Sequence, residues 1–384
     1  MKTKLRFLFI ALALFAGVHP AQPALVQMGI TPAGSNAILF WPATLTNYVL
    51  QSTTNLNLSS WVSVSNLVPV IANTNFTVTI TNTSPARFFR LYNTNTTAIP
   101  ANMALIPAGS FTMGNCMSSS EGDSGELPLH TVYVSAFYMD VYDVTYSLWQ
   151  SVYNWATNHG YSFDHVGQGK AANHPVGNFD WYDCVKWCNA RSEMEGRTPA
   201  YYTSAAQTTV YRTGRVDVDN SSVKWNAGYR LLTEAEWEKA ARGGASGQRF
   251  PWGNTISESQ ANYFSRGTNY YTYDLSNTGY NPTFNDGVWP YTSPVGYFAP
   301  NGYGLYDMAG NGWHWCWDWY GSYGSASQTD PRGPTSGSGG PNRVERGGSY
   351  DYYADGCRAA CRYGYGPANY SYGIVFRSVL APGQ

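Results

Sequence analysis

Charged side chains are scarce in this chain. Asp, Glu, Lys and Arg make up 12% of the 384 residues, well below the roughly 25% that is usual for soluble domains. The 23 basic and 24 acidic residues nearly cancel, and the Lys and Arg residues form no run. Nucleic acids and anionic membrane surfaces are bound through clustered positive charge, so the sequence predicts neither as a partner.

Cysteines and long apolar segments are also few. Six cysteines cannot provide a disulfide framework for a chain of this length. Cys184 and Cys188 lie one helical turn apart, and we expect both to be small helix residues. After the N-terminal segment no apolar stretch approaches the ~20 residues that span a bilayer. The HExxH, GxSxG and P-loop motifs are absent, which argues against the enzyme classes that they mark.

The N-terminus has the pattern of a secretory signal. Lys2, Lys4 and Arg6 precede an apolar run from 7 to 18, and small residues follow. This arrangement predicts a cleaved signal peptide over residues 1–21 and a secreted, periplasmic or cell-surface protein.

Residues 25–94 differ in composition from the rest of the chain. They are rich in Thr, Asn, Val and Leu, and residues 48–52 and 76–81 alternate with a period of two. Alternation between turn residues predicts half-buried strands, so we expect a small all-β sandwich. The pattern is similar to fibronectin-type-III-like modules of exported bacterial proteins. Residues 95–102 form a polar linker, and residues 103–384 form a second domain.

The second domain carries a series of ordered motifs. One is a helix signature: Thr233 can cap a helix, Glu236 can complete a capping box, and Gly243 can end it. The other motifs include Gly347-Gly348-Ser349-Tyr350, Cys357-Arg358-Ala359-Ala360 and Val375-Phe376-Arg377-Ser378-Val379. This series resembles the formylglycine-generating-enzyme (sulfatase-modifying factor) domain family. The resemblance implies an α+β, C-type-lectin-like, loop-rich fold with two main helices, and residues 181–189 read as an amphipathic helix.

Two positions decide which chemistry the resemblance implies. The family's oxidase converts a cysteine in a sulfatase's Cys-x-Pro-x-Arg segment to formylglycine, using oxygen and copper(I) held by two cysteines. Alignment on Gly347 to Tyr350 places Tyr352 at the first cysteine and Cys357 at the second. A phenol is a hard ligand of high pKa and cannot supply the thiolate that copper(I) prefers. Cys361 would lie roughly 13 Å from Cys357 in an extended strand, and only a tight loop would bring the two thiols together. Ser349 matches the family's active-site serine.

The resemblance also implies two calcium sites built from oxygen ligands. The first consists of the side chains of Asn262 and Asp286 and the carbonyls of Tyr263 and Val288. Ordinary loop capping is the alternative for this site. The second consists of Asp307 and the carbonyls of Gly310 and Gly312, with His314 where the family has a glutamate. An imidazole is a poor calcium ligand, so we expect this second site to be lost or weakened.

The segment 351–373 has the composition of a recognition surface. It holds six Tyr and four Gly, which combine large contact area with an adaptable backbone. Tyr and Gly also suit twisted strands and turns, which is the structural alternative. The predicted ligand-binding residues are Tyr352, Tyr353, Tyr363, Tyr365, Asn369, Tyr372, Trp313 and His314. The segment resembles the diversified regions of lectin-fold variable proteins that retroelements mutate.

Three functions remain open on the sequence alone. The preferred hypothesis is an exported, non-catalytic protein that binds a protein, peptide or glycan. The second is a variant oxidase that acts on sulfatase polypeptides through Cys357 and Ser349, with copper as its cofactor. The third is a structural surface protein without a saturable ligand.

Overall fold

The computed structural model describes residues 28–33, 36–43, 48–53, 62–64, 69–81, 88–93, 99–117, 121–335 and 340–383. The predicted signal peptide, residues 1–21, lies outside these ranges. Chain contacts separate two compact units, one up to Ala98 and one over Ile99–Pro382. None of the helices in the described part is long and apolar enough to cross a membrane.

The N-terminal unit consists of strands. One antiparallel sheet has the order β1 (Gly29–Ala33), β2 (Asn36–Pro42), β6 (Asn75–Thr81) and β5 (Val70–Ala72). The other has the order β4 (Val62–Ser63), β3 (Tyr48–Thr53) and β7 (Phe88–Asn93). Leu50 of β3 packs with Leu39, Trp41, Val78 and Ile80 of the first sheet. Two sheets with one shared core match the expected all-β sandwich. The similarity to fibronectin-type-III-like modules stays a prediction.

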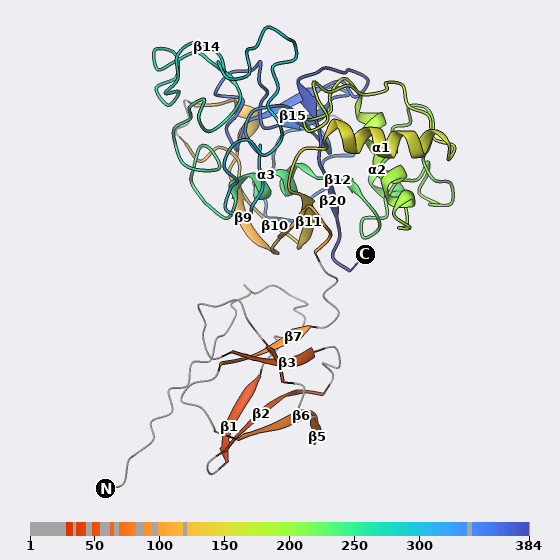
Figure 1. Cartoon of the computed structure of the whole chain (residues 1–384), viewed down its shortest axis with the longest axis vertical. Coiled ribbons are helices and arrows are strands. Elements are labelled where there is room, and N and C mark those ends of the chain that lie inside the picture. The colour runs from red at the N-terminus through yellow and green to blue at the C-terminus, as the bar shows by residue number, and fades with distance from the viewer. Residues whose placement is uncertain are drawn as a thin grey trace. The chain divides into compact units, whose positions relative to one another are not determined.

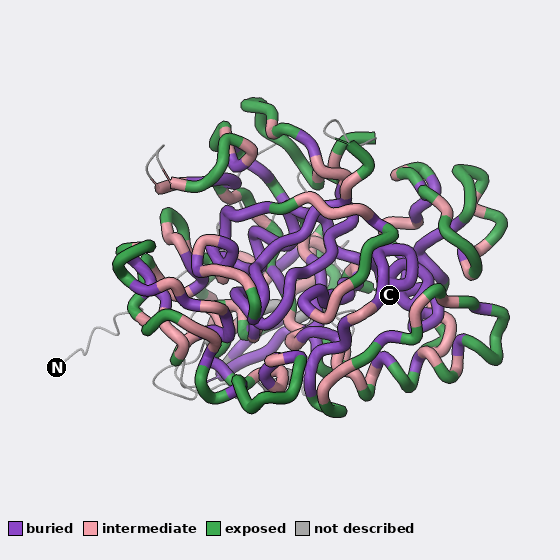
Figure 2. Tube along the Cα trace, turned by 90° about the horizontal axis from the view of Figure 1, so that it is seen from above, coloured by how far each residue is buried: buried purple, intermediate pink, exposed green. Residues whose placement is uncertain are grey.

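The second unit is α+β and rich in loops, as expected (Figure 1). Its described strands form four small sheets, whose members are listed in spatial order. The first sheet has the order β16 (Gln328–Thr329), β10 (His130–Val134) and β9 (Gly109–Met113). The second has the order β12 (Arg230–Leu231), β20 (Ser378–Leu380), β11 (Phe137–Asp140) and β8 (Met103–Ile106). The third has the order β18 (Arg362–Tyr365), β17 (Arg343–Arg346), β15 (Trp313–Trp319) and β19 (Ile374–Val375), and the fourth pairs β13 (Phe264–Ser265) with β14 (Gly279–Tyr280). Figure 2 shows that the buried stretches run through the interior while exposed residues lie on outer loops.

The described residues form three α-helices, one more than the resemblance implied: α1 (Tyr146–Thr157), α2 (Trp181–Met194) and α3 (Glu234–Arg242). Short 3-10 turns cover Ser124–Glu126 and Asn220–Ser222. In α1, Thr145 accepts a hydrogen bond from the Leu148 N–H, and Trp149, Val152 and Ala156 are buried. These apolar residues recur at three- and four-residue intervals, so a helical period was present in the sequence.

The other two helices bear on the sequence predictions in different ways. The capping box of Thr233 and Glu236 is present in α3, and Gly243 ends the helix with a φ of 58°. Both predictions are therefore confirmed. The prediction of an amphipathic helix is wrong for α2: every residue from Trp181 to Ser192 is buried, so the helix has no solvent-facing side there. Cys184 and Cys188 are buried free thiols of this helix.

Candidate functional site

The site region is built on the sheet β18-β17-β15-β19. In β15, Trp313 and Trp315 point to one face, where their rings approach Tyr363 (5.8 Å between centroids) and Tyr365 (6.2 Å) of β18. His314 and Arg346 point to the other face, toward α3. The period of two along a strand thus places the tryptophans and His314 on opposite faces of the sheet. Trp315 is fully buried in the core that also contains α2 residues, so only the tyrosines at the margin of the tryptophan face reach the surface. We call this margin the outer aromatic face and the face toward α3 the inner face.

Buried ion pairs fix this sheet and the loop that follows β17. Arg362 binds Glu234 of α3 through two hydrogen bonds of 2.6 and 2.7 Å. Arg358 binds Glu126 through two more, of 2.7 and 2.8 Å, and Arg346 pairs with Glu238 of α3. Paired guanidinium and carboxylate groups hold planar, defined geometries, so the segment 343–362 is firmly positioned.

Most of the predicted ligand-binding residues gather on the outer face. The Tyr352 ring contacts those of Trp313 (5.1 Å), Tyr353 (5.5 Å) and Tyr363 (6.2 Å). Tyr363 is 47% exposed, whereas Trp313 is buried beneath it. Asn369 is exposed and Tyr372 is partly exposed in the following loop, where the Tyr372 hydroxyl donates to Gln168 Oε1.

His314 does not belong to this surface. It is fully buried on the inner face, where its Nε2 lies 2.7 Å from Asp143 Oδ1 and 3.0 Å from Arg377 Nε. Burial lowers the pKa of His314, which favours the neutral imidazole. The structure therefore removes His314 from the predicted ligand-binding set.

Tyr352 and Cys357 lie in a series of tight turns but pack into different apolar clusters, Tyr352 beside Trp313 and Cys357 with Tyr263. A Cβ atom placed on Gly356 would be only 2.5 Å from the Tyr352 ring, and one placed on Gly348 would be 2.9 Å from Cys357 Sγ. The Tyr352 ring and the Cys357 thiol are thus in close contact with backbone. The amide of Cys361 donates to the Arg358 carbonyl at 3.0 Å. The segment turns here, which is the tight-loop alternative and not the extended strand. Cys361 lies close enough to Cys357 to contribute to the raised pKa of that thiol.

Both thiols and the phenol are held in their neutral forms. Burial raises the pKa of Cys357 well above its ordinary value, with a further contribution from Asp355. Burial also raises the pKa of Cys361 to about 12 and that of Tyr352 to about 12. Neither cysteine is a ready thiolate at neutral pH.

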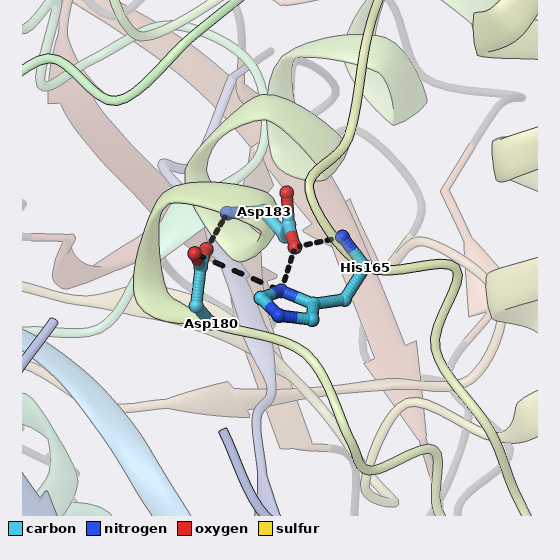
Figure 3. A group of neighbouring side chains, drawn as sticks. All are labelled: His165, Asp180 and Asp183. Carbon is cyan, nitrogen blue, oxygen red and sulfur yellow. Dashed lines mark hydrogen bonds and ion pairs between the residues drawn. The ribbon is translucent and has the colours of Figure 1, made fainter. Parts of the chain in front are cut away.

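A second polar cluster lies at the start of α2, where the side chains of His165, Asp180 and Asp183 meet (Figure 3). His165 Nδ1 lies 3.1 Å from Asp183 Oδ2 and 3.8 Å from Asp180 Oδ2, close enough for the three to share a metal ion. Lys186 and Arg215 already pair with these carboxylates, at 3.1 and 2.9 Å. We therefore interpret the cluster as a charge network. The His165 ring lies 4.0 Å from that of Tyr370, which is 52% exposed, so the network positions Tyr370.

Comparison with known proteins identifies the family. The model of the sulfatase-modifying factor enzyme 1-like domain matches residues 89–382. The chain belongs to the sulfatase-modifying factor family. The formylglycine-generating enzyme of Bos taurus is 36% identical over 278 residues, which cover 67% of this chain and 68% of that enzyme. The formylglycine-generating enzyme of Thermomonospora curvata is 33% identical over 293 residues, or 69% of this chain and 88% of that enzyme.

A solved structure has the same fold. Treponema denticola variable protein 1 superimposes with a TM-score of 0.55 at 28% sequence identity. The match covers 73% of this chain and 95% of that protein. The predicted fold class and family are therefore confirmed.

The residues of this sulfatase-modifying-factor domain do not fit the family's copper ion. The phenol of Tyr352 stands at one ligand position, and it is a hard donor that stays protonated. Cys357 at the other position is a buried thiol. We derive no catalytic step through copper.

The first predicted calcium site already holds a cation from the protein. Lys170 Nζ donates to Asp286 Oδ1 at 2.7 Å and to the Val288 carbonyl at 2.9 Å. The amide nitrogen of Asn262 donates to the Tyr291 carbonyl at 2.8 Å. Two of the four predicted calcium donors thus face an ammonium group, and a calcium ion would have to displace it. Calcium at this site stays a prediction of the resemblance.

The second predicted calcium site contains a buried acid pair. Asp307 accepts a hydrogen bond from the Gly296 N–H at 2.8 Å, and burial together with the Asp143 charge raises its pKa to about 7. Arg377 lies 2.7 Å from Asp143. Asp307 Oδ1 is buried and has no hydrogen-bond partner among the described residues, so one carboxylate oxygen is left to bind an ion. Calcium ligation by Asp307, Gly310 and Gly312 stays a prediction of the resemblance.

Several residues of this region were not predicted from the sequence. They are Lys170, Phe264, Tyr280, Trp289, Tyr291 and Asp351, and all but Asp351 lie far from residue 350 along the chain. Aromatic residues in the loops of 264–291 were the available signal. Their contact with the segment 350–353 depends on the tertiary fold.

Proposed function

We propose that this protein is an exported, non-catalytic ligand-binding member of the sulfatase-modifying factor family. One observation carries the proposal: Tyr352 stands where the family's first copper cysteine is expected, in ring contact with Trp313. Without a thiolate at that position, the copper site that the resemblance implies for the family's oxidases is incomplete. The export of the protein rests on the predicted signal peptide.

The outer aromatic face is the proposed binding surface. It combines exposed rings, such as Tyr363 and Tyr370, with Asn369 and with glycines that allow close backbone approach. Tyrosine offers a rigid apolar ring and a polar hydroxyl, so it contacts peptides and sugars alike. The ligand class is therefore a protein, a peptide or a glycan.

Similarity to a protein called a variable protein supports a related hypothesis. We infer that the segment 351–373 is the part of this chain that a retroelement diversifies. An Asn-rich template copy of the segment next to a reverse-transcriptase gene would be the expected genomic companion. Its absence would make the chain an ordinary family member.

The alternative is a formylglycine-generating oxidase that acts on sulfatase polypeptides. The observation in its favour is the identity of 33–36% to proteins with that name. In that case Cys357 would act with Ser349 in a site that has one cysteine at the two copper positions.

Binding assays on the outer aromatic face test the proposed function. Peptide and glycan arrays would be probed with the wild-type protein and with Tyr363→Ala and Tyr370→Ala. We expect saturable binding that falls about tenfold or more in at least one variant, because truncating a central interface aromatic typically costs about 2 kcal/mol. Tyr297→Ala is the matched control, since Tyr297 is 57% exposed but packs on Phe284 and Phe298. A ligand that binds equally to all variants, or no saturable ligand, would contradict the proposal.

A further inference from the structure

Asp351 presents an exposed carboxylate that the protein holds in place. The hydroxyl of Ser349, a fully buried residue, donates to Asp351 Oδ1 at 2.5 Å. The backbone of Gly373 closes the other side, where an added Cβ would lie 2.8 Å from Ser349 Oγ and 3.1 Å from Asp351 Oδ1. The Asp351 carboxylate is therefore positioned before any ligand arrives.

No basic side chain of the described residues forms an ion pair with Asp351. Lys170 lies 5.9 Å from the Tyr291 ring, but Asp286 and the Val288 carbonyl bind its ammonium group. Arg266 stacks on Tyr353 at 4.6 Å and on Tyr270 at 3.9 Å. Lys170 is thus held by Asp286 and Val288, and Arg266 lies on one ring, Tyr353, of the aromatic group described next. Neither cation forms an ion pair with Asp351 among the described contacts, so the charge of Asp351 is available to a ligand.

A continuous arc of aromatic rings begins at Tyr350, next to Asp351 in the chain, and ends at Tyr353, two residues after it. Neighbouring rings have centroids 4.8–5.9 Å apart, and the arc consists of Tyr350, Trp289, Tyr291, Tyr280, Phe264 and Tyr353. After burial, the charge of Asp351 is the next largest cause that raises the pKa of Tyr280 and of Tyr350. Asp351 thus lies within electrostatic reach of both hydroxyls.

The orientation of the rings favours a compact cation over a flat sugar. Successive rings meet at interplanar angles of 66–87°, so the arc offers no extended platform of parallel faces. A cation gains from the electron-rich faces of several rings at once, and a carboxylate adds direct charge complementarity. Trp289, the best ring type for such a contact, is 48% exposed.

We propose that Asp351 and the arc form a subsite for a Lys or Arg side chain of a partner polypeptide. This inference rests on the proposed binding function and names its ligand chemistry. The rings supply contact area, Asp351 supplies the countercharge, and Ser349 orients the carboxylate. The proposed partner is a polypeptide that presents a basic side chain at its surface.

A pair of short peptides tests the charge requirement. The probes are Ac-Gly-Arg-Gly-NH2 and its neutral isostere Ac-Gly-citrulline-Gly-NH2, titrated against protein with ring-labelled tyrosines and followed by NMR. We expect the Arg peptide to bind at least about tenfold more tightly than the citrulline peptide, and Asp351→Asn to remove that difference. Asp217→Asn is the control, because Asp217 is also an exposed aspartate that accepts a hydroxyl hydrogen bond, from Tyr182 at 2.7 Å.

The outcomes separate this inference from the function on which it rests. Equal binding of the two peptides, or unchanged binding by Asp351→Asn, overturns the basic-side-chain subsite. If a glycan such as chitotriose binds instead and Tyr363→Ala abolishes that binding, the ligand-binding function stands while the subsite falls. Because Asp351 is exposed and Asn has the same shape, the variant is expected to fold, and its unfolding midpoint is measured alongside.

Discussion

Lys170 contacts two of the four groups that the resemblance assigns to the first calcium site. Its ammonium group bridges Asp286 and the Val288 carbonyl, which were both expected to bind calcium. A monovalent side chain on a flexible stem neutralises the carboxylate without requiring an ion. The local sequence around Asp286 could not reveal this, because Lys170 is far away in the chain.

Calcium is therefore expected to leave the thermal midpoint of the wild-type protein unchanged, measured with calcium and with EDTA. Lys170→Met frees the two donors, and we expect that variant to gain calcium-dependent stability. The gain would be about 2.7 kcal/mol once free calcium is 100 times its Kd. Lys224→Met is the control, because Lys224 binds only the Tyr202 hydroxyl among the described polar groups. A calcium-dependent midpoint in the wild type would restore the first predicted site.

At the scale of single elements, strand β17 presents alternate side chains to the two faces of the sheet. Arg346 points inward to Glu238, while Glu345 lies opposite Tyr363 of β18 and Trp315 of β15. Glu345 is buried, and its Oε1 has no hydrogen-bond partner among the described residues. Burial raises the pKa of Glu345 to about 8, so the folded protein holds this carboxyl group protonated at neutral pH.

The raised pKa of Glu345 makes stability depend on pH. The folded state binds a proton that the unfolded state loses above its ordinary pKa of 4.5. The stabilisation is thus fully present below pH 4.5 and is lost as the pH rises toward about 8. Between pH 5 and 8, the free energy of unfolding should fall less in Glu345→Gln than in the wild-type protein, by on the order of 3 kcal/mol. Urea unfolding at several pH values gives the free energy of unfolding as a function of pH. If this free energy falls equally with pH in both proteins, the raised pKa of Glu345 is contradicted.

Local elements were predicted better than the contacts between them. The α3 capping box was visible because Thr233 and Glu236 lie three residues apart, and the ends of α3 are set by neighbouring residues. The complete burial of α2 was missed because it depends on what packs around the helix. The aromatic arc that begins beside Asp351 was missed for the same reason: Trp289 reaches Tyr350, and Tyr280 reaches Tyr291, only through the folding of non-repetitive loops.

For the whole molecule, the family fold is retained while Tyr352 stands where the resemblance implies the first copper cysteine. The match over residues 89–382 and the paired arginines behind the sheet show that the scaffold is intact. Tyr352 lies on the outer aromatic face, whereas His314, where the resemblance implies a glutamate, is buried on the inner face. An intact scaffold can carry different chemistry, since function resides in the site and not in the fold.

The most direct test of the non-catalytic account is mass spectrometry of a Cys-x-Pro-x-Arg peptide after incubation with oxygen and copper-loaded protein. We predict that the wild-type protein leaves the peptide mass unchanged. Tyr352→Cys, tested in parallel, reports whether restoring the first cysteine is enough to restore turnover on this scaffold. Conversion of the peptide cysteine to formylglycine by the wild-type protein would contradict the account and place Cys357 at the centre of a one-cysteine oxidase.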